Sequence, residues 1–166
     1  MPMLDSQKSQ MGAGLIEVLV AILLLGVGLL GLAGLQTQSL KYNNEAYIRS
    51  RATILAQDMA DRLRANRDVA LTNTSLYTFK LTDTPGSNLT LCDSSNCSPQ
   101  QLAQYDFAQW RGEISADLPD GKGALEPLAK SSSVDWQDYK ITISYTLQQG
   151  GQGNGQAVTL TYIARI

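Results

Sequence analysis

Residues 18–35 read VLVAILLLGVGLLGLAGL, a run without a charged or strongly polar side chain, and the next charge along the chain is Lys41. At about 1.5 Å of rise per helical residue the run spans roughly 27 Å, close to the thickness of the hydrocarbon core of a bilayer. The run therefore predicts one membrane-spanning helix near the N-terminus.

Two other structures could contain such a run. A secretory signal peptide has a shorter apolar region, a positive charge before it and small residues at its cleavage site, whereas here Glu17 precedes the run and residues 36–39 read QTQS. A helix buried on all sides needs a large protein around it, and only about 125 residues remain. The membrane anchor is favoured over both.

The composition describes one small domain and excludes several kinds of chemistry. The chain has 166 residues, a formal net charge of −2, a pI near 5.0 and a mean hydropathy of −0.13. It has room for one core and lacks the basic excess of a dedicated nucleic-acid binder. Histidine is absent, which excludes His-based metal sites and Ser-His or Cys-His catalysis. We expect no enzymatic activity, no cofactor and no metal.

An ionisable side chain stands immediately before the apolar run. A charge at the centre of a bilayer costs about 2.5 to 3.5 kcal/mol, so Glu17 suggests a paired or functional carboxylate. An interfacial carboxylate or a charge favoured at a helix N-terminus also explains Glu17, but neither explains the residues before it. Residues 12–21 read GAGLIEVLVA after a short polar leader that carries Lys8. This string resembles the class III signal of type IV prepilins and pseudopilins.

The resemblance implies how the N-terminus is processed. A prepilin peptidase would cut between Gly12 and Ala13 and methylate the new amine of Ala13, which makes Glu17 the fifth mature residue. Ala13 and Gly14 depart from the phenylalanine and the Ser or Thr that are usual there. The new amine could then pair with Glu17 of a neighbouring subunit shifted along the axis. Opposite charges about 4 Å apart gain about 4 kcal/mol at an effective dielectric constant of about 20, enough to set the register between apolar helices.

Four glycines lie inside the run: Gly26, Gly28, Gly31 and Gly34. Small residues let transmembrane helices approach closely, but glycine is also frequent in membrane helices without such a role. Both interpretations stay open.

A helical pattern continues beyond the anchor, with no proline between Pro2 and Pro85. It predicts one helix from about Gly14 to about Asn66, with residues 13–35 in the membrane and residues 36–67 packed on a head formed by residues 68–166. The apolar stripe consists of Ile48, Ala52, Leu55, Met59 and Leu63. Arginines at 62, 64 and 67 could form a DNA-binding patch, but cations at the end of a helix are favoured without any ligand.

The head is predicted to begin with short strands and a cysteine pair. Strand candidates are residues 77–81 and 89–92. Two cysteines without histidine cannot form a structural zinc site. If the anchor places the head in the periplasm, a local disulfide between Cys92 and Cys97 is the default.

A helix and a hairpin follow. Ser98 as N-cap, Pro99 and Gln101 predict a helix start, and Leu118-Pro119-Asp120-Gly121 ends the helix. Its apolar face is Ala103, Phe107, Trp110, Ile114 and Leu118. Alternating residues predict strands from Tyr139 and at residues 157–165, joined by the glycine-rich QQGGQGNGQ, which precedes a strand and is therefore a poor phosphate-binding loop. The fold class is thus α+β: a long helix with a small head of antiparallel sheet and a short helix, a ladle.

Two further segments narrow the resemblance. Residues 97–123, CSPQQLAQYDFAQWRGEISADLPDGKG, and GLLGLAGLQ in the anchor resemble PilV-type minor pilins. This implies a subunit stored in the bacterial inner membrane with its head in the periplasm, cleaved by prepilin peptidase and built with other major and minor pilins into a type IV pilus, where it helps to prime assembly or cap the tip. Alternatives are a minor pseudopilin of type II secretion and a tip adhesin or DNA-capture subunit. Enzymatic activity is the least favoured hypothesis, because the carboxylates of the head are typical of solvated surface charge. These carboxylates are Asp117, Asp120, Glu126, Asp135 and Asp138.

Overall fold

The computed structural model describes residues 14–86, 90–129, 135–147 and 155–166. The chain divides into two compact units, Met1–Asn43 and Asn44–Ile166, and the second is called the head unit below. The predicted leader with the cleavage site Gly12–Ala13 lies outside the described residues, as does most of the glycine-rich hairpin tip.

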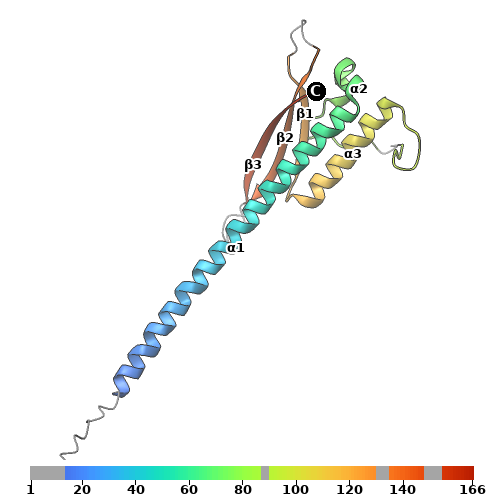
Figure 1. Cartoon of the computed structure of the whole chain (residues 1–166). Coiled ribbons are helices and arrows are strands. Elements are labelled where there is room, and N and C mark those ends of the chain that lie inside the picture. The colour runs from blue at the N-terminus through green and yellow to red at the C-terminus, as the bar shows by residue number, and fades with distance from the viewer. Residues whose placement is uncertain (1–13, 87–89, 130–134, 148–154) are drawn as a thin grey trace, which may run out of the picture. The chain divides into compact units, whose positions relative to one another are not determined.

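The longest element is helix α1, Leu15–Ala65 (Figure 1). It confirms the predicted helix from about Gly14 to Asn66, which no proline interrupts. Its side chains change character along its length: those from Leu15 to Leu25 are exposed, and continuous burial on one face begins at Ile48. By length and composition α1 could cross a membrane.

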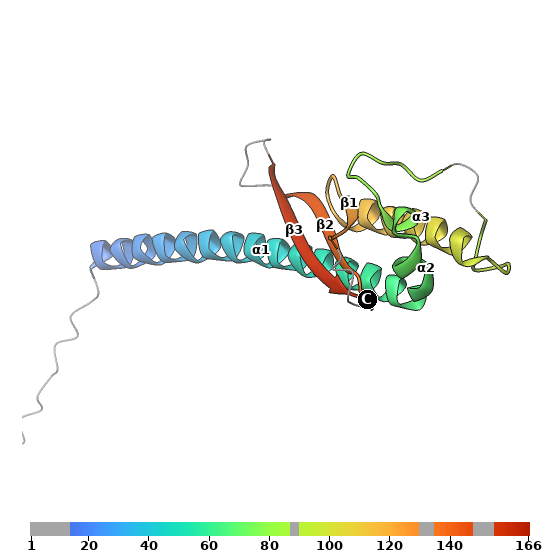
Figure 2. The ribbon, with the colours of Figure 1, turned by 90° about the horizontal axis from the view of Figure 1, so that it is seen from above.

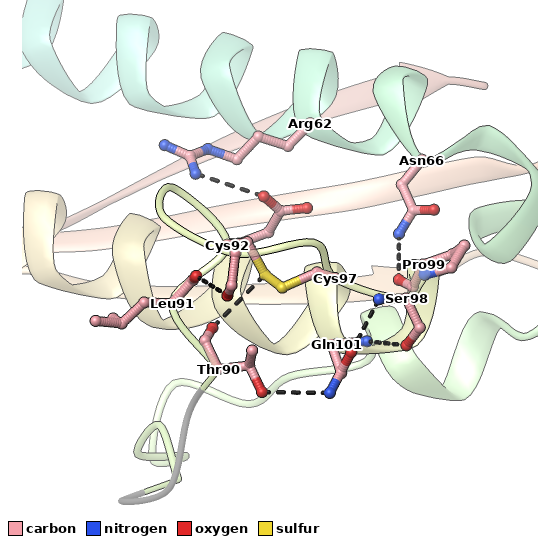
Figure 3. The surroundings of a disulfide bond; sticks show 11 residues. Arg62, Asn66, Thr90, Leu91, Cys92, Cys97, Ser98, Pro99 and Gln101 are labelled. Atoms are coloured by element: carbon pink, nitrogen blue, oxygen red, sulfur yellow. Dashed lines mark hydrogen bonds and ion pairs between the residues drawn. A yellow bond between two sulfur atoms is a disulfide. The ribbon is translucent and has the colours of Figure 1, made fainter.

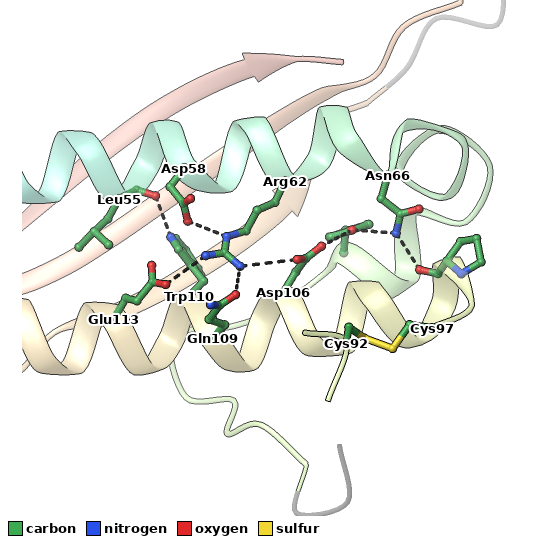
Figure 4. Close-up of polar contacts among 12 residues, drawn as sticks. Leu55, Asp58, Arg62, Asn66, Cys92, Cys97, Asp106, Gln109, Trp110 and Glu113 are labelled. Carbon is green, nitrogen blue, oxygen red and sulfur yellow. Dashed lines mark hydrogen bonds and ion pairs between the residues drawn. A yellow bond between two sulfur atoms is a disulfide. The ribbon is translucent and has the colours of Figure 1, made fainter. Parts of the chain in front are cut away.

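The head unit combines the end of α1 with three shorter helices and a sheet. The chain continues through α2 (Arg67–Thr72), the 3-10 turn η1 (Thr74–Tyr77) and α3 (Pro99–Asp117). The strands are β1 (Lys122–Pro127), β2 (Asp138–Leu147) and β3 (Gln156–Arg165). They form an antiparallel sheet in the order β1-β2-β3. Figure 4 shows α1 and α3 side by side with the strands behind them. The predicted α+β class is therefore confirmed.

One hydrophobic core joins these layers. Every second residue of β2 is buried, from Tyr139 to Leu147, as the alternation predicts. The predicted stripes of α1 and α3 are buried in the same core, including Leu55, Met59 and Trp110. Capping of α3 is also as predicted, because the Ser98 and Gln101 side chains exchange hydrogen bonds with each other's main chain.

Two strand predictions were wrong and one strand was missed. Residues 74–77 form η1, and within 77–81 the chain makes a single bridge, in which Phe79 pairs with Leu125. Residues 90–92, the described part of the other candidate, contain no strand. The missed strand β1 reads KGALEP, and its glycine and proline hide the alternation that marks a strand. Pairing with β2, a non-local contact, decides that it is extended.

Candidate assembly interface

Glu17 lies in the first turn of α1, where its main-chain N–H donates to the Gly14 carbonyl oxygen over 2.8 Å. Its side chain is exposed, and no described residue of the chain is a partner of the carboxylate. A carboxylate that must enter a lipid or protein environment needs a counter-charge. The described residues supply no counter-charge for the Glu17 carboxylate, so a counter-charge would have to come from a group outside them.

The apolar run presents its side chains outward all around the helix. Exposed fractions of the large apolar side chains between residues 18 and 35 range from 49% at Val20 to 76% at Leu30. A Cβ atom added at Gly26, Gly28, Gly31 or Gly34 would meet nothing within 4 Å. Exposed apolar surface of this extent needs lipid or other protein segments to cover it.

In the head unit, Arg62 connects α1 to α3 (Figure 4). Its guanidinium donates to Asp58 Oδ2 at 2.6 Å, Gln109 Oε1 at 2.6 Å and Glu113 Oε1 at 3.1 Å. Asp106 Oδ1 lies 3.6 Å from it. The Arg62 side chain is only 15% exposed, so these partners stabilise a charge that is largely removed from water.

A second set of polar contacts continues from Asp106. The Tyr77 hydroxyl donates to Asp106 Oδ2 at 2.9 Å, and Asn66 donates to the Tyr77 hydroxyl oxygen at 3.0 Å and to the Pro99 carbonyl oxygen at 2.7 Å. Burial raises the pKa of Asp106, although the Tyr77 hydrogen bond and Arg62 act in the opposite direction. The contacts tie the end of α1, η1 and α3 together.

The arginines at the end of α1 and at the start of α2 are engaged within the chain. Arg64 pairs with Asp61, and Arg67 donates to the Asp135 carbonyl oxygen. With Arg62 bound to α3, these contacts favour a structural role over the DNA-binding alternative. The sequence showed only the i,i+4 partner of Arg62, Asp58, because helical spacing reveals local pairs and not partners on another helix.

A disulfide lies directly before α3 (Figure 3). Cys92 and Cys97 are bonded to each other, as predicted. The capping residue Gln101 also donates to the hydroxyl oxygen of Thr90 at 3.3 Å. The disulfide and the cap together hold the segment before α3 against the first turn of that helix.

The carboxylates considered for an enzyme do not converge on one site. Asp117 pairs with Arg51, Glu126 pairs with Lys140, and Asp138 binds Arg165 through both of its oxygens, at 2.8 and 2.9 Å. The Arg165 hydrogen bond lowers the pKa of Asp138. In the part of the chain that the structure describes, no three Cys, Asp or Glu side chains are placed to hold a metal ion. Asp117, Glu126 and Asp138 thus form three separate ion pairs, each with a different basic residue.

Comparison with known proteins adds a family match. Residues 34–108 match the Tt1218-like family model, described as type IV pilin Tt1218. The matched segment begins inside the apolar run and ends within α3, and it covers somewhat less than half of the chain. No curated protein and no solved structure matches the chain significantly. The match supports a pilin that associates with other pilins and does not single out the PilV-type subgroup.

Proposed function

We propose that this chain is a minor type IV pilin of the PilV type, which is stored in the inner membrane, processed by prepilin peptidase and incorporated into a pilus. The observation that carries the proposal is the match of residues 34–108 to a type IV pilin model, on a chain whose α1 begins with a membrane-length apolar run. The small α+β head unit, which contains the end of this helix, supports the same function.

Cleavage between Gly12 and Ala13 would create a partner for the carboxylate of Glu17. Cleavage there creates an amine four residues before Glu17, whose carboxylate has no partner among the described residues. In a filament, the amine of one subunit would lie against Glu17 of its neighbour, and each charge would leave water paired. The exposed apolar side chains of the two helices would cover each other in place of lipid.

The proposed place of the subunit is at the start or the tip of the filament. The resemblance of residues 97–123 to PilV-type minor pilins supports this place. The subunit would act through contact with its neighbours and not through turnover, with its head in the periplasm before assembly and on the cell-surface pilus afterwards.

Mass spectrometry of the purified protein tests the first step. In cells that contain prepilin peptidase we expect a chain that begins at Ala13 and carries one added methyl group, and in peptidase-deficient cells a chain that begins at Met1. A chain that keeps Met1 in peptidase-positive cells would overturn the proposal.

The second step separates a pilus from a secretion pseudopilus. Pili sheared from the producing cells should contain the chain, and the chain should co-purify with pilus subunits. Co-purification with type II secretion subunits, together with its absence from sheared pili, would favour the pseudopilin instead.

A further inference from the structure

Main-chain hydrogen bonds at its margins establish which way each strand of the sheet directs its N–H and C=O groups. Phe79 and Leu125 exchange both N–H···O bonds, at 2.8 Å each, so the main-chain groups of Leu125 point away from β2. Main-chain groups alternate in direction along a strand, and the even-numbered residues of β1 therefore pair with β2. The bond from Leu128 N–H to the Asp138 carbonyl oxygen, at 2.8 Å, agrees with this assignment.

The same alternation carries across β2 to β3. Even-numbered residues of β2 face β1, so its odd-numbered residues pair with β3, at partner positions 158, 160, 162 and 164. Gln137 and Ile166 continue this ladder with two main-chain bonds. The odd-numbered residues of β3 consequently direct N–H and C=O away from the sheet. They are Ala157, Thr159, Thr161, Ile163 and Arg165.

This outer edge of β3 has no partner in the described part of the chain. β3 is the last strand in the sheet order, and no described main-chain group bonds to its five outward-facing residues. Figures 1 and 2 both show β3 at the outside of the sheet. The opposite edge differs, because Phe79 bonds to β1 at Leu125.

Along most of its length the edge also lacks the features by which proteins protect exposed strands. Residues 157–164 read AVTLTYIA, without a charge or a proline, and the one charged residue of the edge, Arg165 at its end, is bound to Asp138. Edge strands normally carry Lys, Pro, a bulge or a covering segment, since an unpaired edge is a template for another strand. The β1 edge carries such features in Lys122, Glu126 and Pro127. β3 is therefore the edge at which the sheet can grow.

The two faces of β3 indicate the chemistry of an added strand. On the inner face Val158, Leu160 and Tyr162 are only half-buried, whereas the neighbouring row on β2 is fully buried. A strand with apolar side chains on that face would cover the exposed part of the row. On the outer face Thr159 and Thr161 would lie beside its polar or small side chains. The fitting segment is uncharged, extended and of alternating polarity.

A second copy of this chain does not fit the edge. Antiparallel pairing of two β3 strands is a twofold rotation about an axis normal to the sheet, and it reverses the direction of the α1 segment packed on that sheet. In a filament whose subunits all have the same polarity, as in the proposed function, two copies cannot hold the α1 segments of their head units antiparallel to each other. Parallel pairing of the same two edges turns one sheet over, so the second Leu160 row would lie on the wrong face.

We propose that the outer edge of β3 binds an extended, uncharged segment of a different protein chain in the same filament, which adds a fourth strand to the sheet. The inference rests on the proposed function only for the source of that segment. Main-chain hydrogen bonds supply the affinity in this mode of binding, and the alternate side chains supply the specificity.

Amide exchange of the full chain in detergent micelles tests whether the edge is open. Amides of Thr159, Thr161 and Ile163 should exchange freely, while those of Val158, Leu160 and Tyr162 are protected by β2. Protection of both sets in a monomeric chain, or a β3-linked dimer, would overturn the proposal.

Edge variants in the producing cells test whether the edge is used. Thr161→Pro removes an outward N–H that the sheet does not need, and Thr161→Lys places a charge on the edge. We expect the amount of either variant in sheared pili to fall about tenfold, with unchanged levels in the membrane. Thr161→Val keeps the N–H, and Thr142→Lys adds the same charge to the adjacent residue on β2. Both controls should enter pili normally.

The outcomes separate this inference from the proposed function. If the wild-type chain is missing from pili, the pilin function fails. If the wild-type chain is present and Thr161→Lys enters pili as well as Thr142→Lys does, the function stands and the edge inference fails. A photo-crosslinking residue at position 161 should give an adduct with a different pilus protein, and a homodimer as its main adduct would refute the inference.

Discussion

Replacing Arg62 with methionine is expected to destabilise the head unit by about 3 kcal/mol at neutral pH. The substitution keeps an unbranched apolar side chain but removes the guanidinium, which contacts Asp58, Asp106, Gln109 and Glu113. The Asp106 side chain, 8% exposed, would lose its only cationic partner among the described residues. Breaking a buried pair by removing one partner typically costs about 3 to 5 kcal/mol. The lower end applies because Tyr77 still donates to Asp106.

The matched control is Arg64→Met, two residues further along α1. Arg64 is 49% exposed and pairs only with Asp61, 73% exposed, so its loss should cost no more than about 0.5 kcal/mol. Adding Asp106→Asn to Arg62→Met should recover about 1 to 2 kcal/mol, because the double variant no longer buries an unpaired charge.

The assay is urea unfolding of the full chain in non-ionic detergent, followed by the fluorescence of buried Trp110. Equal stabilities of Arg62→Met and Arg64→Met would refute the argument that the buried Arg62 contacts hold α1 to α3. A double variant less stable than Arg62→Met would show that the unpaired Asp106 charge is not the main cost.

The same variant has a predictable pH dependence. Because the pKa of Asp106 is raised in the folded chain, the folded state binds the proton more tightly than the unfolded state does. Asp106 protonation therefore contributes stability below the ordinary carboxyl pKa, and this contribution is lost as the pH rises through the raised pKa. Arg62 lowers that pKa, so its removal raises it further. The cost of Arg62→Met should shrink as the pH falls from neutral.

Four other perturbations give further tests. Glu17→Ala should insert into the membrane normally but lower the amount of chain in sheared pili, because the carboxylate that would pair with the neighbour's amine is lost; unchanged incorporation refutes the register role. The double variant Cys92→Ser, Cys97→Ser should lose about 2 kcal/mol in urea unfolding, the value for so short a loop, and a reducing agent should then have no further effect. Gly123→Ala should cost about 1 to 3 kcal/mol, because an added Cβ would lie 2.4 Å from the Trp110 ring. In α3, a Cβ added at Gly112 would meet nothing within 4 Å, so Gly112→Ala should stabilise the chain by about 0.5 to 1 kcal/mol. The urea midpoint should therefore be lowest for Gly123→Ala, intermediate for the wild type and highest for Gly112→Ala.

Local patterns in the sequence were enough to predict the long helix with its apolar first part, α3, and the antiparallel pair β2 and β3. Each of these elements carries its signal in neighbouring residues: an unbroken apolar run, a stripe repeated every three or four residues, the Ser98 cap, and strict alternation after Tyr139. The disulfide between Cys92 and Cys97 was predicted from the short separation of the two residues and from the oxidising compartment that a periplasmic head implies. Cleavage between Gly12 and Ala13 rests on the resemblance to prepilins and stays a prediction, since both residues lie outside the described part of the chain.

Contacts between distant segments were decided only by the tertiary structure. The strand β1 is extended because β2 offers main-chain partners, and Phe79 forms a bridge because it meets Leu125 of β1. The string KGALEP by itself indicates neither contact. Arg62 lies 44 residues before Asp106 along the chain, and only the packing of α1 on α3 brings the two charges together. The open edge of β3 has the same origin, since a strand becomes an edge through the order of strands in its sheet and not through its own sequence.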